Sequence, residues 1–256
     1  MMLANTEAGS GPPLILLHGL FGAGQNWGAI RKTLAPRFRV LTPDLRNHGN
    51  SPHAADMSYA AMAGDVTALM DAEGIDQAAI LGHSMGGKVA MMLALAHPDR
   101  VGRLVIADIA PIRYPPSLRS YITAMQAMPL TPGLTRRDAD ASLAATIPEA
   151  GIRAFLLQSL RLGHDPPVWR LGLDELAAAM PGIEDFDAPP GARYDGPTLV
   201  MGGEASRYIR PDNHAQFLAL FPRARFTTIP KAGHWIHAEN PAGFLAALEP
   251  FLDGGD

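Results

Sequence analysis

The sequence of 256 residues contains no cysteine, which excludes disulfides, a thiolate nucleophile and a metal held by cysteine. This composition fits a reducing compartment, and we expect a cytoplasmic protein. No apolar run approaches the ~18 residues of a transmembrane helix, and the first residues lack the charged and apolar regions of a signal peptide. The net charge is only −4 and no block of like charges occurs, so we expect neither nucleic acid nor a membrane as a partner.

Apolar runs of strand length alternate with helical patterns near both ends of the chain, and 47% of the residues are hydrophobic. The expected strands cover residues 14–17, 38–42, 78–81, 103–107, 197–202 and 225–229. Between about residues 112 and 194 many prolines break the helical patterns, and we find no convincing strand. This arrangement predicts an α/β fold with a doubly wound, mostly parallel sheet. We divide it into a core domain of residues 1–111 and 195–256 and a helical cap insertion of residues 112–194.

The most informative stretch is the spacing Gly82-x-Ser84-x-Gly86, which lies between a strand pattern and a helix pattern. A strand that turns into a helix within about one residue strains the serine backbone and exposes its hydroxyl, and the glycines leave room for the turn. The motif alone also arises by chance in glycine-bearing loops. Its position between the two patterns is the context that the nucleophile elbow of α/β-hydrolases requires. We predict that Ser84 is the nucleophile.

A serine hydroxyl is a weak nucleophile at neutral pH and needs a general base and an orienting acid. In this fold the base follows the last strand, where the sequence has Gly233-His234-Trp235, and we predict that His234 is the base. The acid lies between the serine and the histidine in chain order. Two carboxylates end consecutive expected strands there: Asp108 before the cap and Glu204 after it.

The oxyanion hole of such a site needs two hydrogen-bond donors, which are usually backbone amides. We predict Met85, next to the nucleophile at the start of a helix, as one donor. The second donor comes from the loop after the first buried strand, His18-Gly19-Leu20-Phe21-Gly22. There we choose Leu20 and keep Phe21 as the near alternative. We interpret His18 as a structural residue that braces this loop.

Five motifs together resemble the YbfF-type esterases of the α/β-hydrolase superfamily. They are His18-Gly19-Leu20-Phe21-Gly22, Asp44-x-Arg46-Asn47-His48-Gly49-x-Ser51-Pro52, Gly82-His83-Ser84-Met85-Gly86-Gly87-Lys88, Asp108-Ile109-Ala110-Pro111 and Gly233-His234-Trp235. The resemblance spans residues 18–235 and implies hydrolysis of carboxylic esters, of short to medium acyl chains, without a cofactor. It also implies that the acid follows the strand before the cap, which matches Asp108 rather than Glu204.

We therefore expect a serine carboxylesterase that forms an acyl-enzyme intermediate on a small-molecule ester. We expect no cofactor and no metal, and either a monomer or a homodimer. A thioesterase or a C–C bond hydrolase would use the same triad, and the sequence does not separate them. A non-catalytic ligand-binding module on this fold is the remaining alternative. It is disfavoured because Ser84, His234 and an acid are all present.

Overall fold

Short apolar runs form most strands of a seven-stranded sheet in the order β1-β3-β2-β4-β5-β8-β9, while the edge strand β1 is polar. The structure, a computed structural model, describes residues 1–254. The strands are β1 (Asn5–Ala8), β2 (Pro13–Leu17), β3 (Arg39–Pro43), β4 (Ala78–His83), β5 (Val101–Ala107), β8 (Thr198–Gly203) and β9 (Ala224–Ile229). β1 pairs antiparallel with β3, whereas the other pairings of this sheet are parallel. Each expected strand overlaps one of these, and the mostly parallel α/β fold is confirmed.

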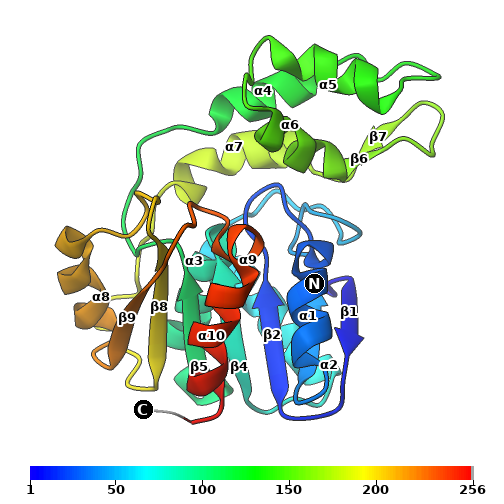
Figure 1. Ribbon diagram of the computed structural model, residues 1–256. Coiled ribbons are helices and arrows are strands. Elements are labelled where there is room, and N and C mark those ends of the chain that lie inside the picture. Colours follow the sequence, from blue (N-terminus) through cyan, green and yellow to red (C-terminus); the bar gives the residue numbers. More distant parts are fainter. Residues whose placement is uncertain (255–256) are drawn as a thin grey trace.

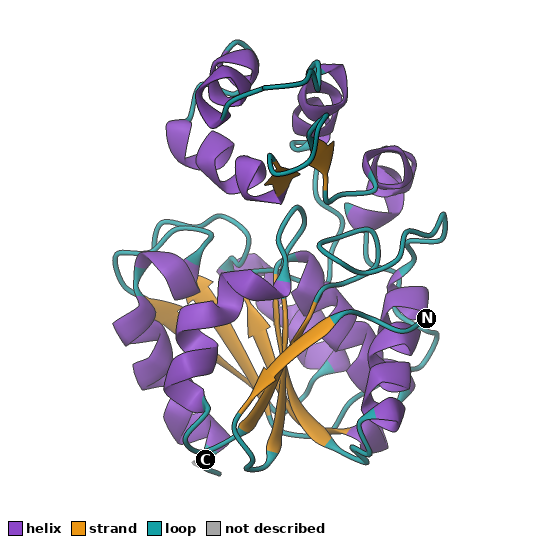
Figure 2. Ribbon diagram, turned by 90° about the vertical axis from the view of Figure 1, so that its right-hand side faces the viewer, coloured by secondary structure: helices purple, strands orange, loops and turns teal. Residues whose placement is uncertain are grey.

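Helices cover both faces of the sheet (Figure 2). One face packs against α1 (Gly28–Leu34) and α10 (Pro241–Leu252), and the other packs against α2 (Tyr59–Ala72), α3 (Met85–Ala96) and α8 (His214–Leu220). Successive side chains of a strand point to opposite faces. On β2, Leu14 and Leu16 therefore pack beside α1 and α10, while Ile15 and Leu17 pack on the opposite face. The shorter helical turns are α9 (Ile236–Glu239), η1 (Gly24–Trp27), η2 (Pro98–Arg100), η3 (Leu157–Ser159) and η4 (Pro211–Asn213).

Residues 112–194, here called the helical segment, lie over the carboxyl ends of the parallel strands (Figure 1). The segment contains α4 (Arg119–Ala127), α5 (Arg136–Ala144), α6 (Ala150–Leu156) and α7 (Leu173–Ile183). It also contains a short antiparallel pair, β6 (Leu160–Arg161) and β7 (Val168–Trp169). The expectation of no strand in this region was wrong. Strands of two residues are too short to show the alternation by which a strand is recognised in a sequence.

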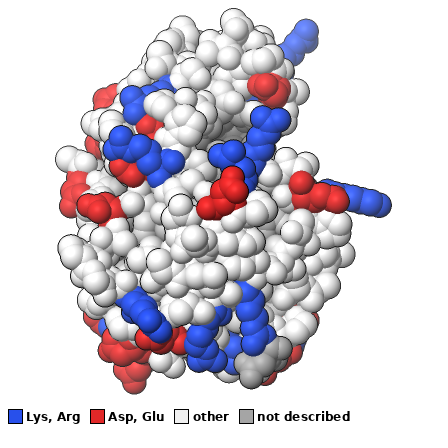
Figure 3. Space-filling model, turned by 90° about the vertical axis from the view of Figure 1, so that its left-hand side faces the viewer, with Lys and Arg blue, Asp and Glu red and all other residues white. Residues whose placement is uncertain are grey.

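Parallel strands that end at one edge of a sheet bring the loops that follow them together, and open α/β sheets place their sites there. Here those loops follow β2, β3, β4, β5, β8 and β9 and lie beneath the helical segment (Figure 1). On the face shown in Figure 3, the surface is hollowed where the helical segment meets the rest of the molecule, and acidic and basic side chains are interspersed. Within residues 1–254, none of the helices is long and apolar enough to cross a membrane.

Candidate active site

Ser84 occupies a strained turn between β4 and α3. Its φ of 53° lies in the left-handed region, which non-glycine residues rarely adopt. The turn is tight: a Cβ added at Gly82 would lie 2.0 Å from the Gly86 carbonyl oxygen, and one added at Gly86 would lie 2.5 Å from the His18 carbonyl oxygen. Both positions therefore require glycine, which explains the Gly-x-Ser-x-Gly spacing by direct contact of backbones. The surrounding fold holds Ser84 in this conformation.

Asp108 and His234 are joined by a hydrogen bond, with 2.7 Å between His234 Nδ1 and Asp108 Oδ2. Asp108 follows β5 and is fully buried, with a φ of 52°. Its carboxylate also accepts from the Gly203 amide at 3.0 Å and from the Ser206 hydroxyl. Because a carboxylate accepts hydrogen bonds, this pairing assigns the proton of the His234 ring to Nδ1. His234 Nε2 is then left with a lone pair that can accept a proton.

Glu204, the other candidate acid, is exposed just beyond β8. Its carboxylate accepts a hydrogen bond from the Lys231 amide at 2.8 Å. Within residues 1–254 the carboxylate that contacts the His234 ring by a hydrogen bond is that of Asp108. The geometry therefore pairs the histidine with Asp108 and places Glu204 in the surface loop.

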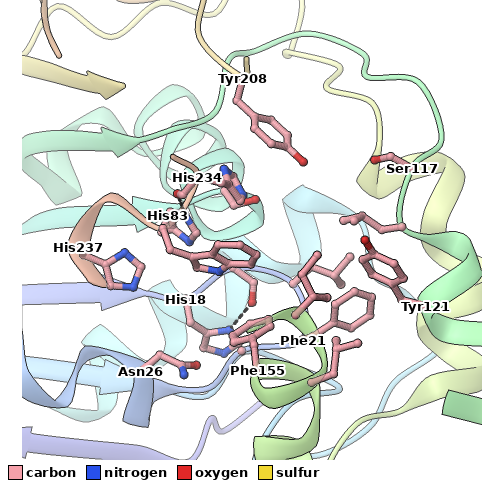
Figure 4. Close-up of a pocket in the computed structure, with 18 of the residues that line it drawn as sticks. His18, Phe21, Asn26, His83, Ser117, Tyr121, Phe155, Tyr208, His234 and His237 are labelled. Atoms are coloured by element: carbon pink, nitrogen blue, oxygen red, sulfur yellow. Dashed lines mark hydrogen bonds between the residues drawn. The ribbon is translucent and has the colours of Figure 1, made fainter. Parts of the chain in front are cut away.

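Ser84 and His234 line the same cavity, although no hydrogen bond joins them among residues 1–254. Hydrogen bonds between catalytic groups are often long in free enzymes and tighten when substrate binds. The cavity has a volume of about 330 Å³. Figure 4 shows His83, His234 and His237 on one side of it and Ser117 and Tyr121, from the helical segment, on the other.

The loop after β2 passes directly beside the serine, since a Cβ added at Gly19 would lie 3.2 Å from Ser84 Cβ. In this loop the Phe21 amide donates to His48 Nε2 at 3.2 Å, and Phe21 has a φ of 65°. The Phe21 amide is therefore engaged, which favours Leu20 as the loop donor. Met85 is the first residue of α3, where backbone amides have no partner within the helix and the helix dipole favours negative charge.

Buried histidines near the site are held neutral. Burial lowers the pKa of His18 and of His237 to about 4 and that of His48 to about 3. His18 Nε2 accepts from the Leu45 amide at 2.9 Å, and its Nδ1–H donates to the Gly19 carbonyl at 2.8 Å. His18 therefore braces the loop as expected. Neutral rings add no positive charge that would disfavour protonation of His234 during the reaction.

His83 is a neighbour of the base that the sequence analysis missed. Burial lowers its pKa well below the ordinary histidine value, and its Nε2–H donates to the His234 carbonyl at 2.7 Å. Two further contacts come from the loop after β8: Ser206 donates to Asp108, and Tyr208 stacks on the His234 ring with centroids 4.1 Å apart. His83 could have been found from its place at the carboxyl end of the central strand β4. Ser206 and Tyr208 carry no signal in the sequence.

No group of three or more histidine, aspartate or glutamate side chains within residues 1–254 is arranged to hold a metal ion. The polar groups at the site are the hydrogen-bonded pair Asp108 and His234, and Ser84, which lines the same cavity as His234. Such a set can activate a hydroxyl, and the backbone amides beside Ser84 can stabilise an oxyanion.

Comparison with known proteins finds relatives both in sequence and in structure. A sequence model described as the alpha/beta hydrolase family matches residues 14–247. The chain is 42% identical over 251 residues to the mouse (Mus musculus) sn-1-specific diacylglycerol lipase ABHD11, covering 94% of this chain and 81% of that protein. It is 37% identical to esterase YbfF of Escherichia coli, covering 94% and 93% of the two chains. Among solved structures, a marine microorganism esterase aligns with a TM-score of 0.93 at 36% identity, over 98% of each chain.

Proposed function

Because the chain belongs to the alpha/beta hydrolase family and is a carboxylic ester hydrolase, we propose that it hydrolyses esters of short to medium acyl chains through an acyl-enzyme intermediate. The observation that carries the mechanism is the 2.7 Å hydrogen bond between Asp108 and His234 at the cavity lined by Ser84. The helical segment acts as the cap that covers this cavity. The substrate is a small-molecule ester, and the mechanism needs no cofactor.

In the first half of the reaction the Ser84 oxygen attacks the acyl carbon while His234 Nε2 takes the hydroxyl proton. The carbonyl π electrons move onto oxygen, and the amides of Leu20 and Met85 stabilise this oxyanion. In sites of this kind, the loss of one such donor costs roughly 10²- to 10³-fold in kcat. The tetrahedral species collapses, the bond to the alcohol oxygen breaks, and His234 returns its proton to the departing alcohol.

In the second half a water molecule replaces the alcohol. His234 takes a proton from the water as the water attacks the acyl-enzyme carbon, and the bond to Ser84 breaks with return of the proton to Ser84. Asp108 keeps the imidazole in the orientation that exposes Nε2 and stabilises the imidazolium in both halves. The acid product then leaves the cavity.

The test is the steady-state kinetics of the purified protein on 4-nitrophenyl esters and on thioesters that carry the same acyl groups. We expect turnover of the esters, with a pre-steady-state burst of 4-nitrophenol wherever deacylation is slower than acylation. A higher kcat/KM on every matched thioester would identify a thioesterase instead. Absence of turnover on all of them would support the ligand-binding alternative.

A further inference from the structure

Two cavities meet at Ser84. Beside the large cavity lies a smaller one of about 50 Å³, and both are lined by Leu20, Ser84, Ser117, Leu118 and Tyr208. Their other walls differ. His234 lines only the large cavity, whereas Met85 lines only the small one. Ser84 therefore lies between two compartments: the large cavity on the side of His234 and the small cavity on the side of α3.

The chemistry of ester hydrolysis assigns one part of the substrate to each compartment. His234 must protonate the leaving alcohol, so the alcohol oxygen has to lie beside its ring, in the large cavity. The carbonyl oxygen faces the amides of Leu20 and Met85, and the acyl chain extends away from the leaving group. We propose that the large cavity binds the alcohol and that the small cavity binds the acyl group. This inference rests on the proposed esterase function.

The large and the small cavity differ in volume and in the residues that line them. A cavity of about 10–15 Å³ by this measure holds one water molecule, so the small cavity has room for a few water-sized groups, which corresponds to a short acyl chain. Its outer wall is formed by Met180 and Ile183 of α7. The large cavity is more than six times as big and is closed by aromatic and aliphatic side chains, among them Tyr121, Ile152 and Phe155.

Lys88 keeps the outer wall of the small cavity in place. It lies on α3 with a side chain that is 1% exposed, and its ammonium donates to the carbonyls of Ile183, Glu184 and Asp185 at 3.4, 3.3 and 2.8 Å. These carbonyls lie at the carboxyl end of α7, where the helix dipole favours a cation. The Tyr59 hydroxyl donates to the same Ile183 carbonyl at 2.7 Å. The contacts of Lys88 and Tyr59 thus tie α3 and α2 to the end of α7 and hold the wall of the small cavity in place against a longer chain.

The substrate class that fits this arrangement is an ester of a short carboxylic acid with a larger, apolar alcohol. Its apolar surface would lie mainly on the alcohol side and would be removed from water against the aromatic walls of the large cavity. An ester with the same atoms but a long acyl chain and a short alcohol would have to force its chain against Met180 and Ile183.

A pair of isomeric esters tests the assignment in the wild-type protein. Hexyl acetate and ethyl hexanoate have the same composition, similar hydrophobicity and similar leaving groups. We expect kcat/KM for hexyl acetate to be at least tenfold higher, since a single misplaced methylene in a hydrophobic pocket is worth about tenfold or more. Equal values, or a preference for ethyl hexanoate, would overturn the assignment while leaving the esterase function intact. No turnover of either isomer or of 4-nitrophenyl acetate would overturn the proposed function and the assignment with it.

Two matched variants locate the effect in the two compartments. Met180→Ala opens the wall of the small cavity, and we expect it to shift the ratio of kcat/KM values toward ethyl hexanoate by about tenfold. Ile152→Ala changes only the large cavity, and we expect it to raise KM for hexyl acetate without a shift toward ethyl hexanoate. The opposite pattern would assign the acyl chain to the large cavity. Circular dichroism checks that both variants are folded, and the wild-type ratio decides the question if one of them is not.

Discussion

The substitution Asp108→Asn tests the hydrogen bond on which the proposed mechanism depends. Asp108 Oδ2 accepts from His234 and from Ser206, and Oδ1 accepts from the Gly203 amide. An asparagine can place its oxygen on only one of these sides. If the oxygen faces Gly203, the new NH₂ group faces His234 and favours the ring tautomer with the proton on Nε2. If the oxygen faces His234, the NH₂ group meets the Gly203 amide in a fully buried position, two donors without an acceptor.

The hydrogen bond to Gly203 is buried, so the first arrangement is favoured, and Nε2 then cannot accept the Ser84 proton. The comparable change in a serine protease triad lowers kcat about 10⁴-fold, which is ~5.4 kcal/mol at 1.36 kcal/mol per tenfold. We expect a loss of this order in kcat for Asp108→Asn. The matched control is Glu204→Gln, which removes an exposed charge bonded to the Lys231 amide and should cost less than about tenfold.

The assay is kcat/KM on one activated ester at fixed pH for both single variants and for the double variant, which exposes any coupling between the two carboxylates. Thermal unfolding of each variant separates a loss of catalysis from a loss of structure. A large loss at Glu204 together with a small loss at Asp108 would refute the assignment and move the acid to the loop after β8.

Ser84→Ala should lower esterase turnover by several orders of magnitude without a change in the circular dichroism spectrum, because it removes only the nucleophile. Gly86→Ala should lower the free energy of unfolding and abolish activity, because its Cβ would lie 2.5 Å from backbone oxygens. The control is Gly64→Ala on α2, where the space around the new Cβ is open. It should raise the free energy of unfolding by about 0.5–1 kcal/mol. Burial lowers the pKa of His18 to about 4 and that of His48 to about 3, against 6.5 when unfolded. The unfolded chain therefore binds more protons below pH 6.5, and the free energy of unfolding, measured with urea, should fall between pH 6.5 and 4 by about 3 kcal/mol for each ring.

The parts of the site that could be predicted from the sequence are those fixed by short spacings. Backbone contacts require glycine on both sides of Ser84: Gly82 meets Gly86, and Gly86 meets the strand β2 at Leu17 and His18, so the two glycines are visible as a motif. His234 follows the last strand by a short loop, and the order of strands along the chain was sufficient to place it. The parallel strands β2, β3, β4, β5, β8 and β9 were predictable because each contains a short apolar run next to a helical pattern, whereas β1, with the sequence Asn-Thr-Glu-Ala, carries no such signal.

The remaining details depend on contacts between distant residues. The observation that favours Leu20 over Phe21 is a contact of His48, which lies 27 positions from Phe21 and binds its amide. The choice between Asp108 and Glu204 depends on the directions of two side chains that follow neighbouring strands. The spacing of residues along the sequence does not predict these directions. The role of Lys88 depends on the end of α7, 95 to 97 positions away. These contacts arise from the packing of loops and helices at the carboxyl ends of the strands. A single sequence does not show which residues meet there.

The most direct test of the central claim is the mass of the protein after reaction with a fluorophosphonate, followed by peptide mapping. We expect one covalent adduct per chain, on the peptide that contains Ser84, with no adduct in Ser84→Ala and slow labelling in Asp108→Asn. Labelling depends on an activated hydroxyl beside an oxyanion hole, and it does not require the natural substrate. An adduct on another residue, or an unlabelled wild-type protein that is folded, would contradict the assignment of Ser84 as the nucleophile.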